Sequence, residues 1–182
     1  MSRSRDDQLI WESYLSESPL EYSAPIDSIN FGYGTLTRDK ILNAGGDYLK
    51  SYKHYNVIEL IYGLTHNHYI LDKDSPVAHY SYDKTSKSNQ TKLTWNDKNY
   101  PGLLRSYFVD RIIPSLKTVE SDDMLTSNAF NFWKKLMMQN PELNFSINID
   151  GYRYPLVNPS EIEKYKEKIN CNNEYSRFIV SL

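Results

Sequence analysis

The chain has only one cysteine, Cys171, among its 182 residues. A single cysteine excludes a disulfide within the chain and a metal site made of cysteines alone. No run of apolar residues approaches the roughly 20 that a membrane-spanning helix needs, and the polar N-terminus has no apolar signal-peptide core. These absences predict a cytoplasmic protein with no membrane partner.

The sequence also lacks an excess of either charge. It has 21 Lys and Arg against 23 Asp and Glu, a formal net charge of −2, and the two signs are interspersed. Bulk electrostatics therefore do not indicate nucleic-acid binding. One cluster combines basic and aromatic residues: Lys84, Lys87, Lys92, Trp95, Lys98 and Tyr100. We interpret this cluster as a solvated loop, with contact to single-stranded nucleic acid as the alternative.

Tyrosine is abundant, with 16 residues in the chain. A buried tyrosine contributes a large apolar ring while its hydroxyl bonds a partner or water, so we expect tyrosine in the core. The length predicts one domain over residues 26–182, preceded by an N-terminal appendage over 1–25. Helical spacing from Gln8 to Glu17 predicts a helix in this appendage, which resembles the N-terminal helices of accessory and virion proteins of tailed phages. The bias towards Asn, Lys, Tyr and Ser is also typical of AT-rich phage genomes.

Hydrophobic periodicity divides the rest of the chain into strands and helices. A short helix over 38–42 is expected between a Thr37 cap and a Gly45-Gly46 stop. A meander of three strands follows over 55–64, 68–72 and 77–82, then a polar loop over 83–90 and a short strand over 92–95. The remaining expected elements are a helix from Asn99-Tyr100-Pro101 to Pro114, strands over 116–119, 143–149, 152–157 and 175–182, and helices over 126–139 and 159–169. This order predicts an α/β or mixed α+β fold with a partly parallel central sheet and helices on both faces.

The segment over 116–136 carries a resemblance to a known family. A short apolar strand leads into acidic residues, a Thr/Ser cap and an amphipathic helix that ends Trp-Lys-Lys-Leu. This order resembles the late strand–helix unit of the GNAT acyltransferase superfamily. Ala129 and Leu136 match the family pattern, whereas Thr126 stands at its Asn position and Trp133 at its Tyr position. The order of elements over roughly 35–182 is also similar to that of the family.

The resemblance implies a cofactor, acetyl-CoA or another acyl-CoA. In the family it docks where the fourth and fifth strands separate, with its pyrophosphate on amides at the start of the following helix. The matching loop runs from Asp97 to Gly102, of which only Gly102 fits the family pattern. The implied cofactor-binding residues are Lys98, Gly102, Leu103, Leu104 and Arg105, which offer cations and backbone amides. An ordinary capped helix start is the alternative interpretation of this loop.

The resemblance also implies a general base that takes a proton from the acceptor amine. His79, on the third strand of the meander, is the first candidate, and Glu59, on the first strand, is the second. A structural histidine is the alternative for His79, and core packing is the alternative for Trp133, whose indole cannot act as a proton donor. His66-Asn67-His68 is interpreted as a hairpin rim; a zinc site shared with His79 is its alternative.

Two hypotheses follow. The first is a GNAT-like N-acyltransferase that transfers an acyl group from acyl-CoA to an unidentified amine. The second is a non-catalytic GNAT-like binding or virion accessory protein of a phage, in which residues 1–25 engage a host or virion protein. The expected location is the cytoplasm, which is the host cytoplasm for a phage-encoded protein, or the virion.

Overall fold

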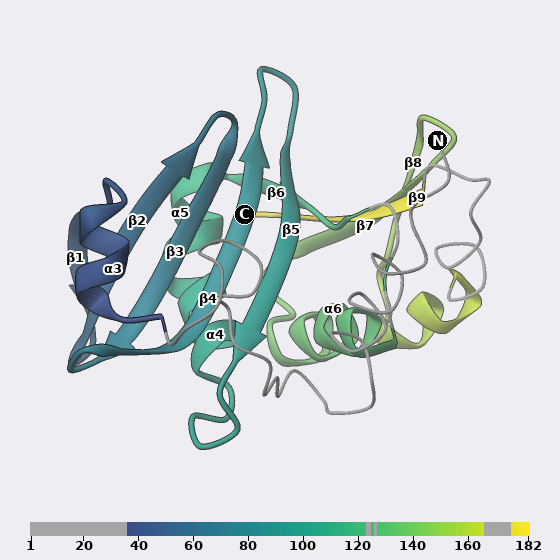
Figure 1. Ribbon diagram of the computed structural model, residues 1–182. Helices are drawn as coiled ribbons and strands as arrows, with labels where there is room; N and C mark the ends of the chain where they lie inside the picture. The colour runs from purple at the N-terminus through teal and green to yellow at the C-terminus, as the bar shows by residue number, and fades with distance from the viewer. Residues whose placement is uncertain (1–35, 123–124, 126, 166–175) are drawn as a thin grey trace, which may run out of the picture.

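The computed structural model describes residues 36–122, 125, 127–165 and 176–182. The expected appendage over 1–25, Thr126 and Cys171 lie outside the described residues. The described part is a mixed nine-stranded sheet with helices, and its strand order is β1-β2-β3-β4-β5-β6-β9-β7-β8 (Figure 1). Only β5 and β6 pair in parallel within it. The coarse prediction of a mixed α+β fold with a partly parallel sheet is therefore confirmed.

The first part of the sheet is an antiparallel meander. Its strands are β1 (Asp47–Tyr52), β2 (Tyr55–Tyr62), β3 (Thr65–Asp72), β4 (Ser75–Lys84) and β5 (Asn89–Asn96). Two-residue connections join the first four strands, and the first residue of each has positive φ: Lys53, Gly63 and Lys73. Such turns match the twist of the paired strands.

Two sequence expectations about the meander are corrected. The strand β1 was not predicted, because its central residues are mostly exposed and carry little apolar periodicity. The expected polar loop over 83–90 is largely strand, since β4 and β5 continue pairing as far as Lys84 and Asn89. Only residues 85–88 remain as the turn, where the Thr85 hydroxyl accepts from the Lys87 and Ser88 amides at 3.2 and 3.0 Å.

The second part of the sheet contains β6 (Thr118–Glu120), β7 (Asn144–Ile149), β8 (Tyr152–Pro155) and β9 (Ser176–Ser181). The strand β9 lies between β6 and β7 and is antiparallel to both. Figure 1 shows β7, β8 and β9 at the right of the view, turned away from the meander. A single residue pair, Gln90 and Glu120, joins β5 to β6.

Helices cover both faces of the sheet. On one face lies α3 (Arg38–Asn43), which begins as expected with the Thr37 hydroxyl accepting from the Lys40 amide at 3.4 Å. Its Ile41 packs in a small core with Ile58, Leu60, Tyr69 and Leu71 of the sheet. The other face carries α4 (Leu103–Tyr107), η1 (Phe108–Ile112), α5 (Ile113–Leu116) and α6 (Ser127–Gln139). Within the expected helix over 159–169, the described residues form the 3-10 helix η2 (Pro159–Tyr165), and 166–169 lie outside the described residues.

The helical segment after β5 differs from the expectation at both ends. It begins after Gly102, whose φ is 75°, rather than at Asn99 or Pro101. It also continues through Pro114 to Leu116. The π-helical η1 ends two residues before Pro114, and the Ile113 amide donates to the Phe108 carbonyl across it, so the hydrogen bonding changes just before the proline.

The larger core lies between the sheet and the helices α4 to α6. Among the described residues, five tyrosines are buried in the two cores, as expected from the tyrosine content: Tyr52, Tyr69, Tyr80, Tyr82 and Tyr107. Burial raises the pKa of Tyr82 to about 12, with the nearby Glu59 carboxylate as a further cause. None of the described helices has both the length and the apolar composition needed to cross a lipid bilayer.

Candidate functional site

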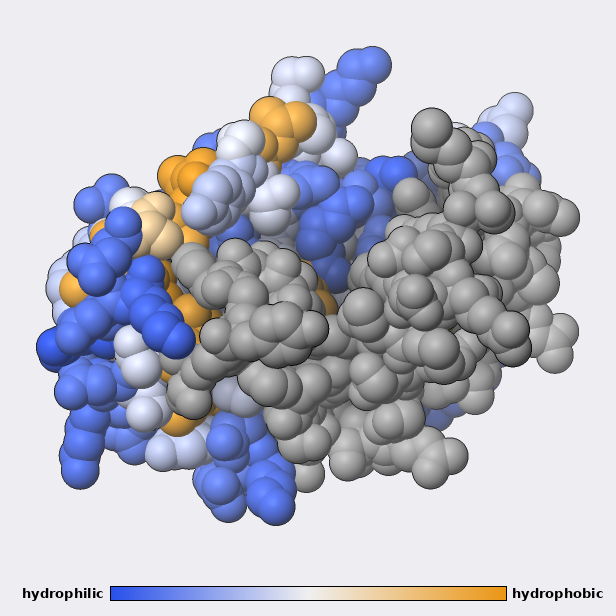
Figure 2. All heavy atoms as spheres, in the orientation of Figure 1, coloured by the Kyte–Doolittle hydropathy of each residue, from blue (hydrophilic) through white to orange (hydrophobic). Residues whose placement is uncertain are grey.

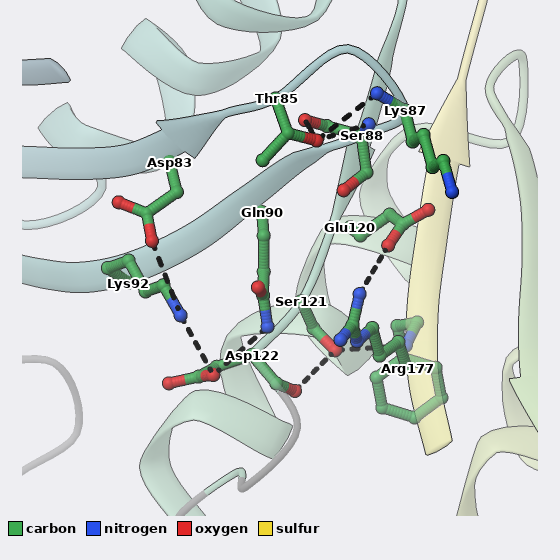
Figure 3. Close-up of polar contacts among 11 residues, drawn as sticks. Asp83, Thr85, Lys87, Ser88, Gln90, Lys92, Glu120, Ser121, Asp122 and Arg177 are labelled. Carbon is green, nitrogen blue, oxygen red and sulfur yellow. Dashed lines mark hydrogen bonds and ion pairs between the residues drawn. The ribbon is translucent and has the colours of Figure 1, made fainter. Parts of the chain in front are cut away.

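The strands β5 and β6 separate beyond their single residue pair, but polar side chains bridge the separation. The side-chain nitrogen of Gln90 donates to an Asp122 carboxylate oxygen at 3.2 Å, and the Lys92 ammonium lies 3.8 Å from the same oxygen (Figure 3). The Lys92 ammonium is also 3.6 Å from the Asp83 carboxylate. These side chains fill the space beside the one bonded pair of β5 and β6, so there is no open slot between the two strands at this point.

The residues after β6 are fixed to β9. The buried Ser121 hydroxyl accepts from the Phe178 amide at 2.9 Å and donates to the Asp122 carbonyl at 3.0 Å. The Arg177 guanidinium donates to the Glu120 carboxylate at 3.0 Å (Figure 3). These contacts connect the end of β6 and the two residues after it to β9.

Asn96, at the end of β5, organises the start of α4. Its side-chain oxygen accepts from the Leu104 amide at 3.0 Å, and its side-chain nitrogen donates to the carbonyls of Asp97 and Tyr100 at 2.9 and 2.7 Å. The Leu103 amide donates to the Tyr100 carbonyl at 3.2 Å. The expectation that the Leu103 and Leu104 amides are open to a pyrophosphate is thus corrected, because both already have acceptors within the chain.

A cavity of about 690 Å³ lies between the β1–β2 turn, the start of α4 and the end of α6. Gly102, Leu103 and Arg105 line it, whereas Lys98 and Leu104 do not. Aromatic rings form one wall: the His54 ring lies 3.9 Å from the Tyr55 ring, centre to centre. The Tyr100 ring meets the Tyr55 ring edge-on at 6.1 Å.

Two cations border this cavity. Arg105 is half-buried, its burial lowers the pKa of its guanidinium, and it has no ion pair within the described part of the chain. Lys53, in the β1–β2 turn, places its ammonium 5.1 Å from the centre of the Tyr52 ring. Asp110, on the opposite side, accepts from the Tyr52 hydroxyl at 2.6 Å. The cavity therefore combines positive charge with aromatic surface, which suits an anion attached to a planar group.

A second cluster forms on the same face of the sheet around the Glu59 carboxylate. One oxygen of Glu59 lies 2.7 Å from His66 Nδ1 and 3.3 Å from His68 Nε2. The other ring nitrogen of His68 lies 2.7 Å from the Tyr107 hydroxyl of α4. The Tyr82 ring stacks on the His66 ring at 4.9 Å. Hydrogen bonding, from His68 and then from His66, lowers the pKa of Glu59 to about 2.

His79 lies on the opposite face of the sheet from Glu59, so the two expected bases are not brought together. Its side chain has no exposed surface, its Nε2 lies 3.1 Å from the Asn67 side-chain oxygen, and its ring stacks on Tyr69 at 4.5 Å. Burial lowers its pKa to about 3, with the charge of His68 as a smaller cause. These contacts agree with the structural alternative for His79.

The alternative zinc site is corrected as well. His66 and His68 face the larger core, and His79 faces the smaller one, so the three imidazoles do not converge. Within the described residues, no group of His, Cys, Asp and Glu is arranged to hold a metal ion. Trp133 is 2% exposed and packs against Phe108, Phe132 and Phe178. These contacts agree with the interpretation of Trp133 as a core residue.

Sequence reasoning did not find three features of these sites: the capping role of Asn96, the aromatic wall of the cavity, and the pairing of Glu59 with His66 and His68. The last had a usable signal, because residues at positions i and i+2 of a strand face the same side. A two-residue turn between β2 and β3 then places Glu59 opposite His68. Comparisons with protein-family models, curated proteins and solved structures found no match to this chain.

Proposed function

We propose that this chain is a GNAT-like N-acyltransferase that moves an acyl group from acyl-CoA to an amine. The observation that carries the proposal is the parallel pairing of β5 and β6 at a single position. Each of these two strands leads into a helix of the larger core. The family resemblance of the 116–136 segment implies this arrangement for the fourth and fifth strands. The two features rest on different evidence, one on sequence and one on topology.

The cavity at the start of α4 is the proposed place for the phosphates and the adenine of acyl-CoA. Arg105 and Lys53 supply positive charge for the phosphates, and the rings of His54, Tyr55 and Tyr100 supply surface for a planar base. The volume is within the ordinary range for a ligand pocket. Since the Leu103 and Leu104 amides are engaged, side chains rather than backbone N–H groups carry the phosphate contacts here.

Calorimetric titration of the full chain with acetyl-CoA and with CoA tests the proposal. We expect micromolar binding that Arg105→Ala weakens about tenfold, which corresponds to about 1.4 kcal/mol, because the variant removes a half-buried cation from the cavity. Lys135→Ala is the matched control, since it removes one exposed positive charge that does not line the cavity. No heat at millimolar ligand, or equal weakening by both variants, contradicts the proposal.

A second function, a GNAT-like module that binds without catalysis, is favoured by two specific observations. Trp133 fills the position of the family's tyrosine and is packed in the core. Gln90, Lys92 and Asp122 bridge the space where the family's cofactor passes between strands. Release of free thiol from acetyl-CoA in the presence of an amine separates the two functions. Binding of CoA without thiol release supports the module, whose partner is then sought with the full chain and a variant lacking residues 1–25.

A further inference from the structure

A second cavity lies in the C-terminal part of the molecule, between the end of α6, the start of β7 and the end of β8. Its volume is about 600 Å³, which is within the ordinary range for a small-molecule pocket. We call it the β8 groove, because Arg153 and Pro155 of β8 line it. It shares no lining residue with the cavity at the start of α4, so its role is independent of the proposed function.

Most of the β8 groove is apolar. Its floor consists of core residues that are at most 8% exposed: Met137, Leu143, Phe145 and Leu156. At its rim, Met138 is 58% exposed and Val157 is 86% exposed. Methionine side chains adapt to partners of different shape. An apolar ligand would therefore rest on buried side chains and cover the two exposed ones.

Arg153 is the only charged residue that lines the β8 groove. Its Nε donates to the hydroxyl of Ser146, a buried residue of β7, at 2.7 Å, and this bond orients the guanidinium. Within the described residues, its two terminal nitrogens have no hydrogen-bond acceptor and no ion pair. The carboxylate of Glu161 is not paired with Arg153, because it accepts from the amides of Val157 and Asn158 at 2.9 and 3.2 Å.

This combination of groups indicates the class of ligand. Two terminal guanidinium nitrogens match the two oxygens of a carboxylate. One positive charge balances a carboxylate, whereas it leaves a phosphate monoester, with nearly two negative charges, only partly neutralised. We propose that the β8 groove binds a carboxylate carried on an apolar chain, such as a medium-chain fatty acid. Arg153 holds the carboxylate, and the apolar floor and rim hold the chain.

The main competing use of this region is pairing of the sheet edge with another chain, because β8 ends the described strand order. The Leu156 amide donates to the Phe145 carbonyl at 2.9 Å, in register with the pairing of β7 and β8. Hydrogen-bonded pairs alternate along an antiparallel ladder, so Arg153 and Pro155 direct their backbone groups away from β7. Proline has no N–H, which leaves the Arg153 amide as the one donor on this edge of β8. Such an edge is a poor template for a second copy or a peptide strand.

Another gathering of exposed apolar side chains lies at the β2–β3 turn. Ile61 is 51% exposed and Leu64 is 62% exposed. Figure 2 shows apolar residues near this turn at the outer edge of the molecule. Neither residue lines either of the two cavities. Shape and apolar character together therefore favour the β8 groove as a ligand site.

Methyl NMR of the full chain tests the proposal, because Met137 and Met138 are two of its four methionines. With ¹³C-methyl methionine, and signals assigned from Met137→Leu and Met138→Leu, octanoate is titrated alongside octanol, a chain of the same length without the charge. We expect octanoate to shift both signals saturably, with a Kd below about 1 mM. The Kd of octanol should be at least about fivefold higher, because it lacks the bonds to Arg153.

Variants of Arg153 separate the charge from the apolar contacts. Arg153→Gln should weaken octanoate binding about tenfold and leave octanol binding unchanged, which also shows that the groove is still formed. Arg153→Lys keeps the charge but loses the paired donors, so we expect a smaller loss of about threefold. Lys164→Gln, on η2, is the control, since it removes an exposed charge that does not line the groove.

Three results would overturn the proposal. The first is the absence of saturable shifts at Met137 and Met138. The second is equal binding of octanoate and octanol, or octanoate binding that Arg153→Gln leaves unchanged, because either shows adsorption to an apolar surface only. The third is a shift of the two signals when the protein is concentrated without ligand, which would show that a second copy occupies the groove.

Discussion

Histidines on the two faces of the sheet have opposite surroundings. His79 is enclosed, stacked on Tyr69 and bonded to the amide of Asn67, so its neutral form is favoured. His66 is partly open to solvent beside a carboxylate. Strand alternation decides this difference: His79 of β4 lies opposite Tyr69, at a position that faces the smaller core, whereas His66 of β3 lies opposite Tyr82, at a position that faces the larger one. At this scale, chemistry depends on which face of the sheet a side chain occupies.

Acid should destabilise the protein through His79. Its pKa is about 3 in the folded protein and about 6.5 in the unfolded chain, so the unfolded chain binds more protons between these values. Its contribution to stability is therefore complete above pH 6.5 and is lost as the pH falls, at about 1.4 kcal/mol per pH unit within that window. Urea unfolding at a series of pH values measures this slope. His79→Phe should reduce it, and an unchanged slope would contradict the burial argument.

The element that positions the candidate cavity is α4, and its start depends on a side chain outside the helix. Asn96 accepts from the Leu104 amide and donates to two carbonyls of the connecting loop. Gly102 lies between Tyr100 and Leu104 in the chain and has a positive φ, a conformation in which a residue with a side chain would be strained. The helix therefore begins where the end of β5 fixes it, rather than where the local cap signal suggests.

Two asparagines near this helix allow a matched comparison. Asn96→Ala removes three hydrogen bonds and leaves buried polar groups unpaired, so we expect it to lower the free energy of unfolding by about 3 kcal/mol. Asn99, the cap expected from the sequence, is exposed, and Asn99→Ala should change stability by less than about 0.5 kcal/mol. Urea denaturation measures both variants. Equal effects would show that Asn96 does not organise the start of α4.

Across the whole molecule, the sheet consists of a meander and a C-terminal part that meet at one residue pair. The side-chain nitrogen of Asn89 reinforces this junction. It donates to the Thr118 carbonyl at 3.0 Å and to the Leu116 carbonyl at 3.4 Å. A side chain thus replaces part of the backbone ladder where the strands separate. The larger core crosses the junction and holds the two parts together.

Asn89→Ala should loosen the C-terminal part selectively. We expect hydrogen exchange at the amides of β6 to become about fivefold faster, corresponding to about 1 kcal/mol, while exchange in β2 and β3 stays unchanged. Hydrogen-exchange mass spectrometry on the full chain measures this difference. Asn56→Ala, at an exposed position of β2, is the control and should leave β6 unaffected. Uniform acceleration throughout the sheet would contradict a local junction.

The sequence by itself determined the local elements of this protein. Thr37 begins α3, a run rich in Val, Ile and Tyr predicts β2, alternation predicts β7, and amphipathic spacing locates α6, because each of these signals acts over a few neighbouring residues. The tyrosine content likewise indicated a tyrosine-rich interior. These features require no knowledge of what lies on the other side of the core.

Only the tertiary structure decided which of these elements meet. The placement of β9 between β6 and β7, the burial of His79 and the pairing of Glu59 with His66 and His68 all depend on strand register and on segments brought together by the sheet. Pro114 remains inside a helix because the π-helical turn before it changes the hydrogen bonding. Such contacts have energies set by partners distant along the chain, so local residue preferences do not specify them.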